Sequence, residues 1–272
     1  MSDLPALREF LDRHTRLFVL TGAGCSTGSG IPDYRDANGN WKRTPPIDYQ
    51  VFMGSALLRA RYWARASVGW RRFAHVQPNA AHHALALLER EGHVELLVTQ
   101  NVDGLHQAAG SQRVVDLHGR LDEVRCMRCD WRSPRGLWQS TLEACNPSWL
   151  ALEAADAPDG DADLEDVDFS TFVVPDCQVC GGIIKPDVVF YGEVIPPERG
   201  ARVRAALAEA DAVFVVGTSL MVHSGYRYVR SAFQAGLPIA ALNLGRTRGD
   251  DMLSLKVMAP CAEALDTLYG PF

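Results

Sequence analysis

Residues 22–35 read GAGCSTGSGIPDYR and directly follow the apolar run LFVL at 17–20. Glycine N–H groups in such a turn approach a pyrophosphate without obstruction from a Cβ atom, and a following helix start adds partial positive charge. The common dinucleotide fingerprint G-x-G-x-x-G requires glycine where this chain has Thr27. We therefore expect a variant nucleotide-phosphate turn, and a glycine-rich connector that binds nothing is the alternative.

Four of the seven cysteines form two C-x-x-C pairs: Cys126 with Cys129, and Cys177 with Cys180. Four thiolates at such spacing make a closed tetrahedral zinc site, which leaves no coordination position for a substrate. The predicted role is structural, because zinc binding supplies on the order of 10 kcal/mol to a small module. A redox pair of the thioredoxin type is the alternative, and two matched pairs disfavour it. The other cysteines are expected to be ordinary buried residues: Cys25, Cys145 and Cys261.

Polar side chains follow the apolar run 94–98, in the segment TQNVDGLH at 99–106. The carboxyl edge of a parallel sheet is where ligands bind, so we expect Gln100, Asn101 and Asp103 to face one. His118 follows another apolar stretch and precedes a glycine. An imidazole that titrates near neutrality is suited to take a proton from a sugar hydroxyl, although a lone histidine is more often structural.

The composition is that of a globular protein. The chain has 272 residues, of which 47% are hydrophobic, and a formal net charge of -6 at pH 7. This acidic balance argues against direct nucleic-acid binding and against anionic membranes. The first residues, MSDLP, lack a signal or transit pattern, and no apolar stretch reaches the length of a membrane span. We expect a cytoplasmic protein that binds neither nucleic acid nor membranes.

Apolar strands alternate with helical segments along much of the chain. The predicted strands are 16–20, 94–98, 212–216 and 238–242, and the predicted helices are 4–14, 79–90, 201–208 and 225–235. This alternation predicts an α/β fold, a doubly wound parallel sheet that is Rossmann-like, with a smaller inserted zinc-binding and helical domain. We assign 1–38, 77–120 and 185–272 to the larger, nucleotide-binding domain, and 39–76 and 121–184 to the small domain. Residues 155–168 are expected to form a mobile, solvated loop.

Taken together, these motifs resemble those of the sirtuins, NAD-dependent protein-lysine deacylases, over nearly the whole chain. The matching segments are 22–35, 99–106, 118–119, both cysteine pairs, 185–193, 217–220 and 243–245. Residues 62–65, 224–227 and 247–251 are most similar to the class II subgroup that includes the mitochondrial lipoamidase-type sirtuin. Tyr34 and Ser224 depart from the phenylalanine and proline that are frequent in the family.

The resemblance implies a set of NAD contacts. The pyrophosphate would be cradled by Ala23, Gly24 and Ser26, with Gly22 as a further cofactor contact. The loop that closes over the nicotinamide half would contain Asp33, Tyr34 and Arg35. The nicotinamide ribose and carboxamide would contact Gln100, Asn101 and Asp103. The remaining contacts, to phosphate, adenosine ribose and adenine, would come from Gly217, Thr218, Ser219, Asn243, Gly245 and Cys261.

The resemblance also implies a mechanism in which NAD is consumed. The acyl-lysine oxygen attacks the ribose carbon that carries nicotinamide, and His118 then acts as general base so that the acyl group passes to ADP-ribose. We assign Asn101 to this catalytic set as well. The substrate backbone would pair with Val189, Phe190, Tyr191, Gly192 and Glu193, by strand addition. The partners expected are therefore acylated-lysine proteins, and the cofactors are NAD and one structural zinc ion.

Tyr62 and Arg65 share a helix face, because they are three residues apart. They match a Tyr-x-x-Arg pair that grips an acidic acyl chain in another sirtuin subgroup, so we hypothesise a preference for longer or acid-terminated acyl groups. An arginine-rich solvated helix is the alternative. Two other functions stay open: protein mono-ADP-ribosyltransfer, and a non-catalytic regulator that binds NAD or acyl-peptides.

Overall fold

The computed structural model describes residues 3–42, 45–164 and 167–270. The chain divides into two compact units. The first, here the sheet unit, comprises residues 1–44, 77–117 and 195–272; the second, here the cysteine unit, comprises 45–76 and 118–194. The sequence placed 118–120 and 185–194 in the NAD-binding domain. They group instead with the cysteine unit, because strand β4 (Gly119–Cys126) pairs with β8 (Ile184–Val188). Residues 39–42 likewise fall in the sheet unit rather than the small domain.

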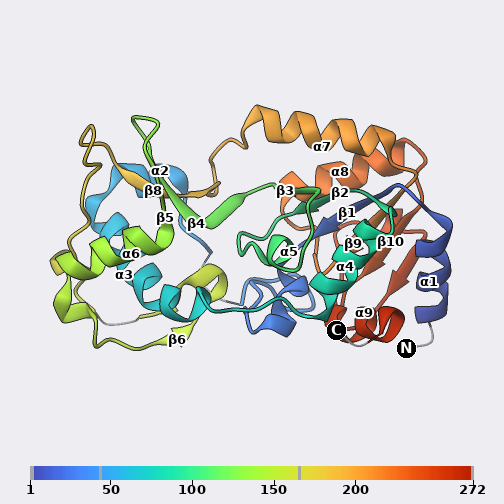
Figure 1. Ribbon diagram of the computed structural model, residues 1–272, viewed down its shortest axis with the longest axis horizontal. Coiled ribbons are helices and arrows are strands. Elements are labelled where there is room, and N and C mark those ends of the chain that lie inside the picture. The colour runs from blue at the N-terminus through green and yellow to red at the C-terminus, as the bar shows by residue number, and fades with distance from the viewer. Residues whose placement is uncertain (1–2, 43–44, 165–166, 271–272) are drawn as a thin grey trace. The chain divides into compact units, whose positions relative to one another are not determined.

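A six-stranded parallel sheet forms the centre of the sheet unit, with strand order β11-β10-β9-β1-β2-β3 (Figure 1). Its strands are β1 (Leu17–Thr21), β2 (Val94–Thr99), β3 (Val114–Asp116), β9 (Ala212–Val216), β10 (Ile239–Leu242) and β11 (Leu255–Val257). Strands β2 and β3 lie to one side of β1, and the last three strands lie to the other. The order therefore reverses between β1 and β9, which is where ligands bind in doubly wound sheets.

Helices cover both faces of this sheet, as the continuous burial of its strands requires. One layer contains α1 (Leu4–Arg13), α4 (Ala80–Arg90) and α9 (Cys261–Tyr269); the other contains α7 (Pro197–Glu209) and α8 (His223–Gln234). Successive β1 residues point to opposite faces of the sheet. Leu17 and Val19 pack in one hydrophobic core, and Phe18 and Leu20 pack in the other. The expected α/β class is confirmed.

The cysteine unit is built on a three-stranded antiparallel sheet, in the order β5-β4-β8, with β5 at Arg132–Pro134. Its helices are α2 (Tyr49–Gly54), α3 (Ala56–Phe73) and α6 (Arg135–Cys145). Asp48 and Ser55 cap α2 and α3, since their side chains accept the N–H groups of Gln50 and Leu58. Trp63 on α3 is fully buried and donates its indole N–H to the carbonyl of Ile184 on β8.

The segment 155–164 corrects one expectation. A solvated loop was predicted, but β6 (Ala155–Asp156) and β7 (Ala162–Asp163) form a hairpin around η4 (Pro158–Gly160). Ala162 and Leu164 are buried against Val68 of α3. The acidic composition led to the wrong prediction, because the two buried apolar residues alternate with partly exposed aspartates.

Two short helices, η3 (Pro147–Trp149) and η5 (Phe169–Thr171), complete the cysteine unit, while α5 (Leu105–Ala108) and η6 (Asp250–Met252) belong to the sheet unit. Among the described residues, no helix combines the length and apolar character that a bilayer crossing requires.

Candidate active site and zinc centre

The loops after β1 and β9 meet at the point where the strand order reverses. The first contains η1 (Ala23–Cys25) and η2 (Thr27–Ser29). Gly24 donates its N–H to the carbonyl of Gly217 at 2.8 Å, and Gly22 donates to Val216 at 3.1 Å. A Cβ on Gly24 would lie 2.9 Å from the Gly217 oxygen, so glycine permits this approach. The structure thus brings the predicted phosphate-binding residues of both loops together.

The segment after β2 supplies a polar network to the same place. Asn101 is buried and donates to the carbonyl of Gly22 and to Ser26 Oγ, both at 3.0 Å. Ser26 Oγ donates in turn to Asp103 Oδ2 at 2.7 Å. Gln100 Nε2 donates to Thr218 Oγ1 at 3.0 Å, which joins the network to the β9 loop. The side chains expected to hold the nicotinamide ribose and carboxamide are therefore preorganised by one another.

Two histidines that the sequence reading did not select lie against this network. His82 and His106 are fully or almost fully buried, with ring centroids 4.8 Å apart. His82 Nδ1 accepts the N–H of Asn79, the N-cap of α4, at 3.2 Å, so its proton sits on Nε2, which faces Ser26 Oγ at 3.5 Å. Burial lowers the pKa of His82 to about 4, and it holds the pKa of His106 well below 6.5. Both rings are neutral near pH 7.

Cys25 lies close enough to these two rings that the three residues form a possible metal-ligand group. The hydrogen bonds of His82 oppose this reading. A metal-bound histidine donates its second ring N–H, whereas the second nitrogen of His82 faces the N–H of Asn79 and must accept. We therefore assign the group a packing and hydrogen-bonding role.

The predicted closing loop is held by its own residues. Arg35 lies over the Trp41 ring at 3.7 Å and donates to the carbonyl of Gly39 at 2.7 Å, while Tyr34 meets Trp41 edge-on. Asp33 forms an ion pair with Lys42.

The expected adenosine contacts follow β9 and β10. Asn243 Nδ2 donates to the carbonyl of Gly245 at 3.0 Å, and the carbonyl of Ser219 accepts the N–H of Arg248 at 2.8 Å. Leu220 adopts a φ of 58°, which is costly for a leucine and indicates a tightly constrained turn. Cys261 is buried at the start of α9.

His118 and the predicted substrate-binding segment, residues 189–193, lie together in the cysteine unit. Val189 donates its N–H to the carbonyl of His118 at 2.7 Å. The next residue, Gly119, has a φ of 82°, and a Cβ there would lie 1.9 Å from the carbonyl oxygen of Asp187. Tyr191 is 40% exposed, and its carbonyl accepts the N–H of Tyr49 at 2.8 Å. Gly192 has a φ of 77° in the same turn.

Tyr62 packs edge-on against Phe52 and Phe190, with centroids 5.4 and 5.3 Å apart. Arg65 lies on the same helix, and its guanidinium contacts both oxygens of Asp161, with the shortest distance 2.9 Å from Nη2. Asp161 belongs to the 155–164 hairpin, and the sequence reading gave it no role. An acidic acyl group would compete with this carboxylate for Arg65.

The four predicted zinc ligands form one cluster. Their sulfurs lie within 4.8 Å of one another, with 3.5 Å between Cys126 and Cys180 and 3.8 Å between Cys129 and Cys177. Tetrahedral zinc with bonds of about 2.3 Å separates its sulfurs by about 3.8 Å, so the cluster fits the ion. Of the three other cysteines, Cys25 and Cys261 are buried as expected, but Cys145 is exposed, which corrects that prediction.

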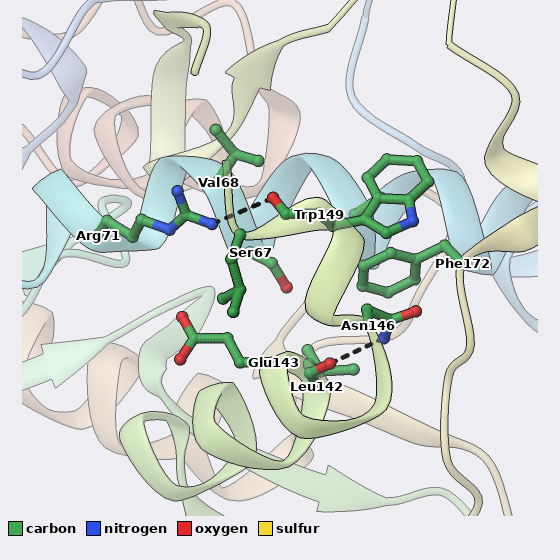
Figure 2. A pocket seen from close by; sticks show the side chains of 10 residues that line it. Ser67, Val68, Arg71, Leu142, Glu143, Asn146, Trp149 and Phe172 are labelled. Atoms are coloured by element: carbon green, nitrogen blue, oxygen red, sulfur yellow. Dashed lines mark hydrogen bonds between the residues drawn. The ribbon is translucent and has the colours of Figure 1, made fainter. Parts of the chain in front are cut away.

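A small cavity in the cysteine unit is unsuited to a substrate. It measures about 10 Å³ and is lined by residues that include Ser67, Glu143 and Phe172 (Figure 2). Arg71 donates across it to the carbonyl of Trp149 at 3.3 Å. A volume of this size holds at most one water molecule.

The comparisons with known proteins decide the family. Residues 22–224 match the Sir2 family, and this range contains both strand-end loops, His118 and all four clustered cysteines. The chain belongs to the Sir2 family. The sirtuin resemblance predicted from the sequence is confirmed at this level.

Relatives of this sirtuin match over most of their length. A protein named NAD-dependent protein deacetylase from Bordetella bronchiseptica is 70% identical over 265 residues, which cover 97% of each chain. The human NAD-dependent protein lipoamidase sirtuin-4, mitochondrial, is 48% identical over 262 residues, which cover 95% of this chain and 83% of the relative.

Solved sirtuin structures share the fold. A structure described as Sir2-p53 peptide-NAD+ has 29% identity and a TM-score of 0.80, covering 97% of this chain and 96% of the other. One described as Sir2 bound to acetylated peptide has 28% identity and a TM-score of 0.78, with the same coverage.

Proposed function

We propose that this sirtuin transfers the acyl group of a protein acyl-lysine to the ADP-ribose of NAD, with His118 as the general base. The NAD-dependent protein deacylase activity itself follows from the family. The proposal adds which residues act, and one observation carries it: the loops after β1 and β9 join at the strand-order reversal through the Gly24–Gly217 hydrogen bond. Backbone N–H groups at that point suit a pyrophosphate.

The Asn101–Ser26–Asp103 network supports the proposed contacts to the nicotinamide half of NAD. Asn101 and Ser26 are buried, and each already makes two hydrogen bonds in this network. A network that is satisfied before substrate arrives loses little conformational freedom when it binds the ribose. We assign Asn101 and Gln100 to the ribose and Asp103 to the carboxamide of nicotinamide. The closing loop and the Asn243–Gly245 turn would complete the NAD contacts.

For the protein substrate, we assign the 189–193 segment to strand addition and His118 to proton abstraction from the ribose. A relative in a solved structure is described as bound to acetylated peptide, which supports acyl-lysine as the substrate class. The four cysteines would hold zinc with no open position, so the ion would stabilise the fold and take no part in the reaction.

The class II assignment also belongs to the proposal. The 48% identity to the human lipoamidase sirtuin-4 supports it, while relatives at 70% are named deacetylases. The cytoplasmic location expected from the sequence stays a prediction.

The experiment incubates the purified protein with NAD and a panel of acetyl-, lipoyl- and glutaryl-lysine peptides, and detects products by mass. Acyl-dependent formation of nicotinamide and O-acyl-ADP-ribose is expected. If ADP-ribosylated protein forms in place of these products and without any acyl-peptide, the activity is mono-ADP-ribosyltransfer. Absence of turnover with every peptide would indicate a non-catalytic regulator. Either result overturns the proposal.

The same panel tests the acyl pocket. If Arg65 binds acidic acyl groups, D161N frees its guanidinium and raises glutaryl turnover relative to acetyl, while R65M lowers it. Unchanged glutaryl-to-acetyl ratios in both variants would reject a role for Arg65 in acyl recognition.

A further inference from the structure

We propose that Lys185 is a positioning residue for the deacylation reaction: its buried ammonium group holds residues 186–193 in a hook whose backbone fixes His118. The inference rests on the proposed role of His118. It concerns a lysine in the cysteine unit that is neither an expected zinc ligand nor an expected substrate contact.

Lys185 lies in β8 with no exposed surface. Its Nζ donates to the carbonyl of Pro186 at 3.1 Å and to the carbonyl of Val188, and it lies 3.1 Å from Glu193 Oε2. It also lies 4.4 Å from the centroid of the Phe190 ring. Residues 186–193 therefore surround the Lys185 ammonium group, which contacts residues on both sides of the turn.

Glu193 closes the hook. Its Oε2 accepts the N–H of Phe190 at 3.0 Å, and its Oε1 accepts from Arg125 Nη2 on β4 at 3.0 Å. The carboxylate thus connects Lys185, the turn and the neighbouring strand. Each of these bonds involves a charged group in a largely buried setting, where hydrogen bonds are strong and directional.

The hook is joined to His118 by the backbone. Val189 donates to the carbonyl of His118 at 2.7 Å, and Gly119 pairs with Val188 in the β4–β8 ladder. The space at this joint is minimal, since a Cβ on Gly119 would lie 1.9 Å from the Asp187 oxygen. A displacement of residues 187–189 would therefore displace the backbone of His118.

The charge of Lys185 is retained despite its burial. Burial lowers its pKa to about 8, against the opposing effect of Glu193, so the ammonium form predominates at pH 7. Arg125 and Asp187 complete the charged surroundings, and Asp187 also pairs with Arg132 at 2.7 Å. A buried ion pair is a weak source of stability compared with apolar packing, whereas its directional bonds specify one geometry.

K185M tests the proposal, because methionine keeps much of the side-chain length and removes the charge. Glu193 keeps two partners in this variant, Arg125 and the N–H of Phe190, so no carboxylate is left unpaired. K185R restores the charge and the donors. K256M serves as the matched control, because Lys256 forms a lysine–aspartate pair with Asp250 at 2.7 Å in the sheet unit.

We expect K185M to lower kcat/KM for acetyl-lysine peptide by about tenfold or more, with unchanged NAD affinity and zinc content. K185R should recover most of the loss, and K256M should match the wild type. A folded K185M with wild-type kcat/KM would overturn the proposal, as would a folded K185R no better than K185M.

If K185M does not fold, E193Q gives the second test. The introduced carboxamide retains an oxygen for the N–H of Phe190 and loses the charge that pairs with Lys185, so the same tenfold loss is expected, and wild-type kcat/KM would overturn the inference. Inactivity of the wild type on every acyl-peptide would contradict the proposed function, whereas an active wild type with equally active variants contradicts this inference alone.

Discussion

Gly24 and Gly217 lie on different strand-end loops and share a hydrogen bond of 2.8 Å from the Gly24 N–H to the Gly217 carbonyl. Gly217 has a φ of 61°, and a Cβ there would lie 2.2 Å from the backbone nitrogen of Cys25. The two loops can approach this closely only because both residues are glycine.

G217A is therefore expected to separate the loops and weaken NAD binding by about tenfold or more, equivalent to at least about 1.4 kcal/mol. Calorimetric titration with NAD measures this. G236A is the matched control: Gly236 has a φ of 76°, but a Cβ there would meet nothing within 4 Å. Equal NAD affinity in the two variants would show that the close approach does not matter for binding.

The zinc cluster predicts that replacing a clustered cysteine lowers zinc content and thermal stability, whereas replacing a cysteine outside the cluster does not. C126A removes one of four ligands and is expected to abolish stoichiometric zinc and lower the thermal midpoint, because binding energy is folding energy for such a module. Metal analysis and thermal melts measure both. C145A is the control, because Cys145 is exposed and lies outside the cluster. The structural role is contradicted if C126A keeps both its zinc and the wild-type midpoint.

The two buried histidines predict acid sensitivity. An unfolded histidine takes up a proton near pH 6.5, but folded His82 does so only near pH 4. Between these values the unfolded state binds more protons, so stability falls as pH decreases from 6.5 to 4, by about 3 kcal/mol for His82. His106 acts in the same direction.

Urea unfolding between pH 4 and pH 8 measures this dependence. H82Q is expected to flatten it, because glutamine does not titrate in this range. An H82Q slope that equals that of the wild type would contradict the assignment.

Much of the sheet unit was predictable, because continuous apolar runs such as 212–216 and polar strand ends such as 99–103 follow local rules of pattern and position. The cysteine spacing likewise indicated the metal cluster. Tertiary contacts were not predictable in this way. His82 lies three residues after Asn79, the N-cap of α4, where many histidines are on the surface. Its burial depends on packing against His106, which the sequence does not indicate.

The 155–164 hairpin shows the same limit. Its aspartates suggested solvation, but Asp161 is held by Arg65, which lies 96 residues away along the chain. The sequence assigned Lys185 only to the 185–193 motif. Its contacts with Val188 and Glu193 depend on strand pairing that no local pattern specifies.

We propose His118 as the general base for acyl transfer to ADP-ribose. The most direct measurement compares wild type, H118A and H75A, a change at an exposed histidine of the same unit, for O-acyl-ADP-ribose formed from NAD and acetyl-lysine peptide. We expect a loss of about a hundredfold or more in H118A, with NAD binding retained, and wild-type product in H75A. Product formation by H118A at the rate of H75A would contradict it.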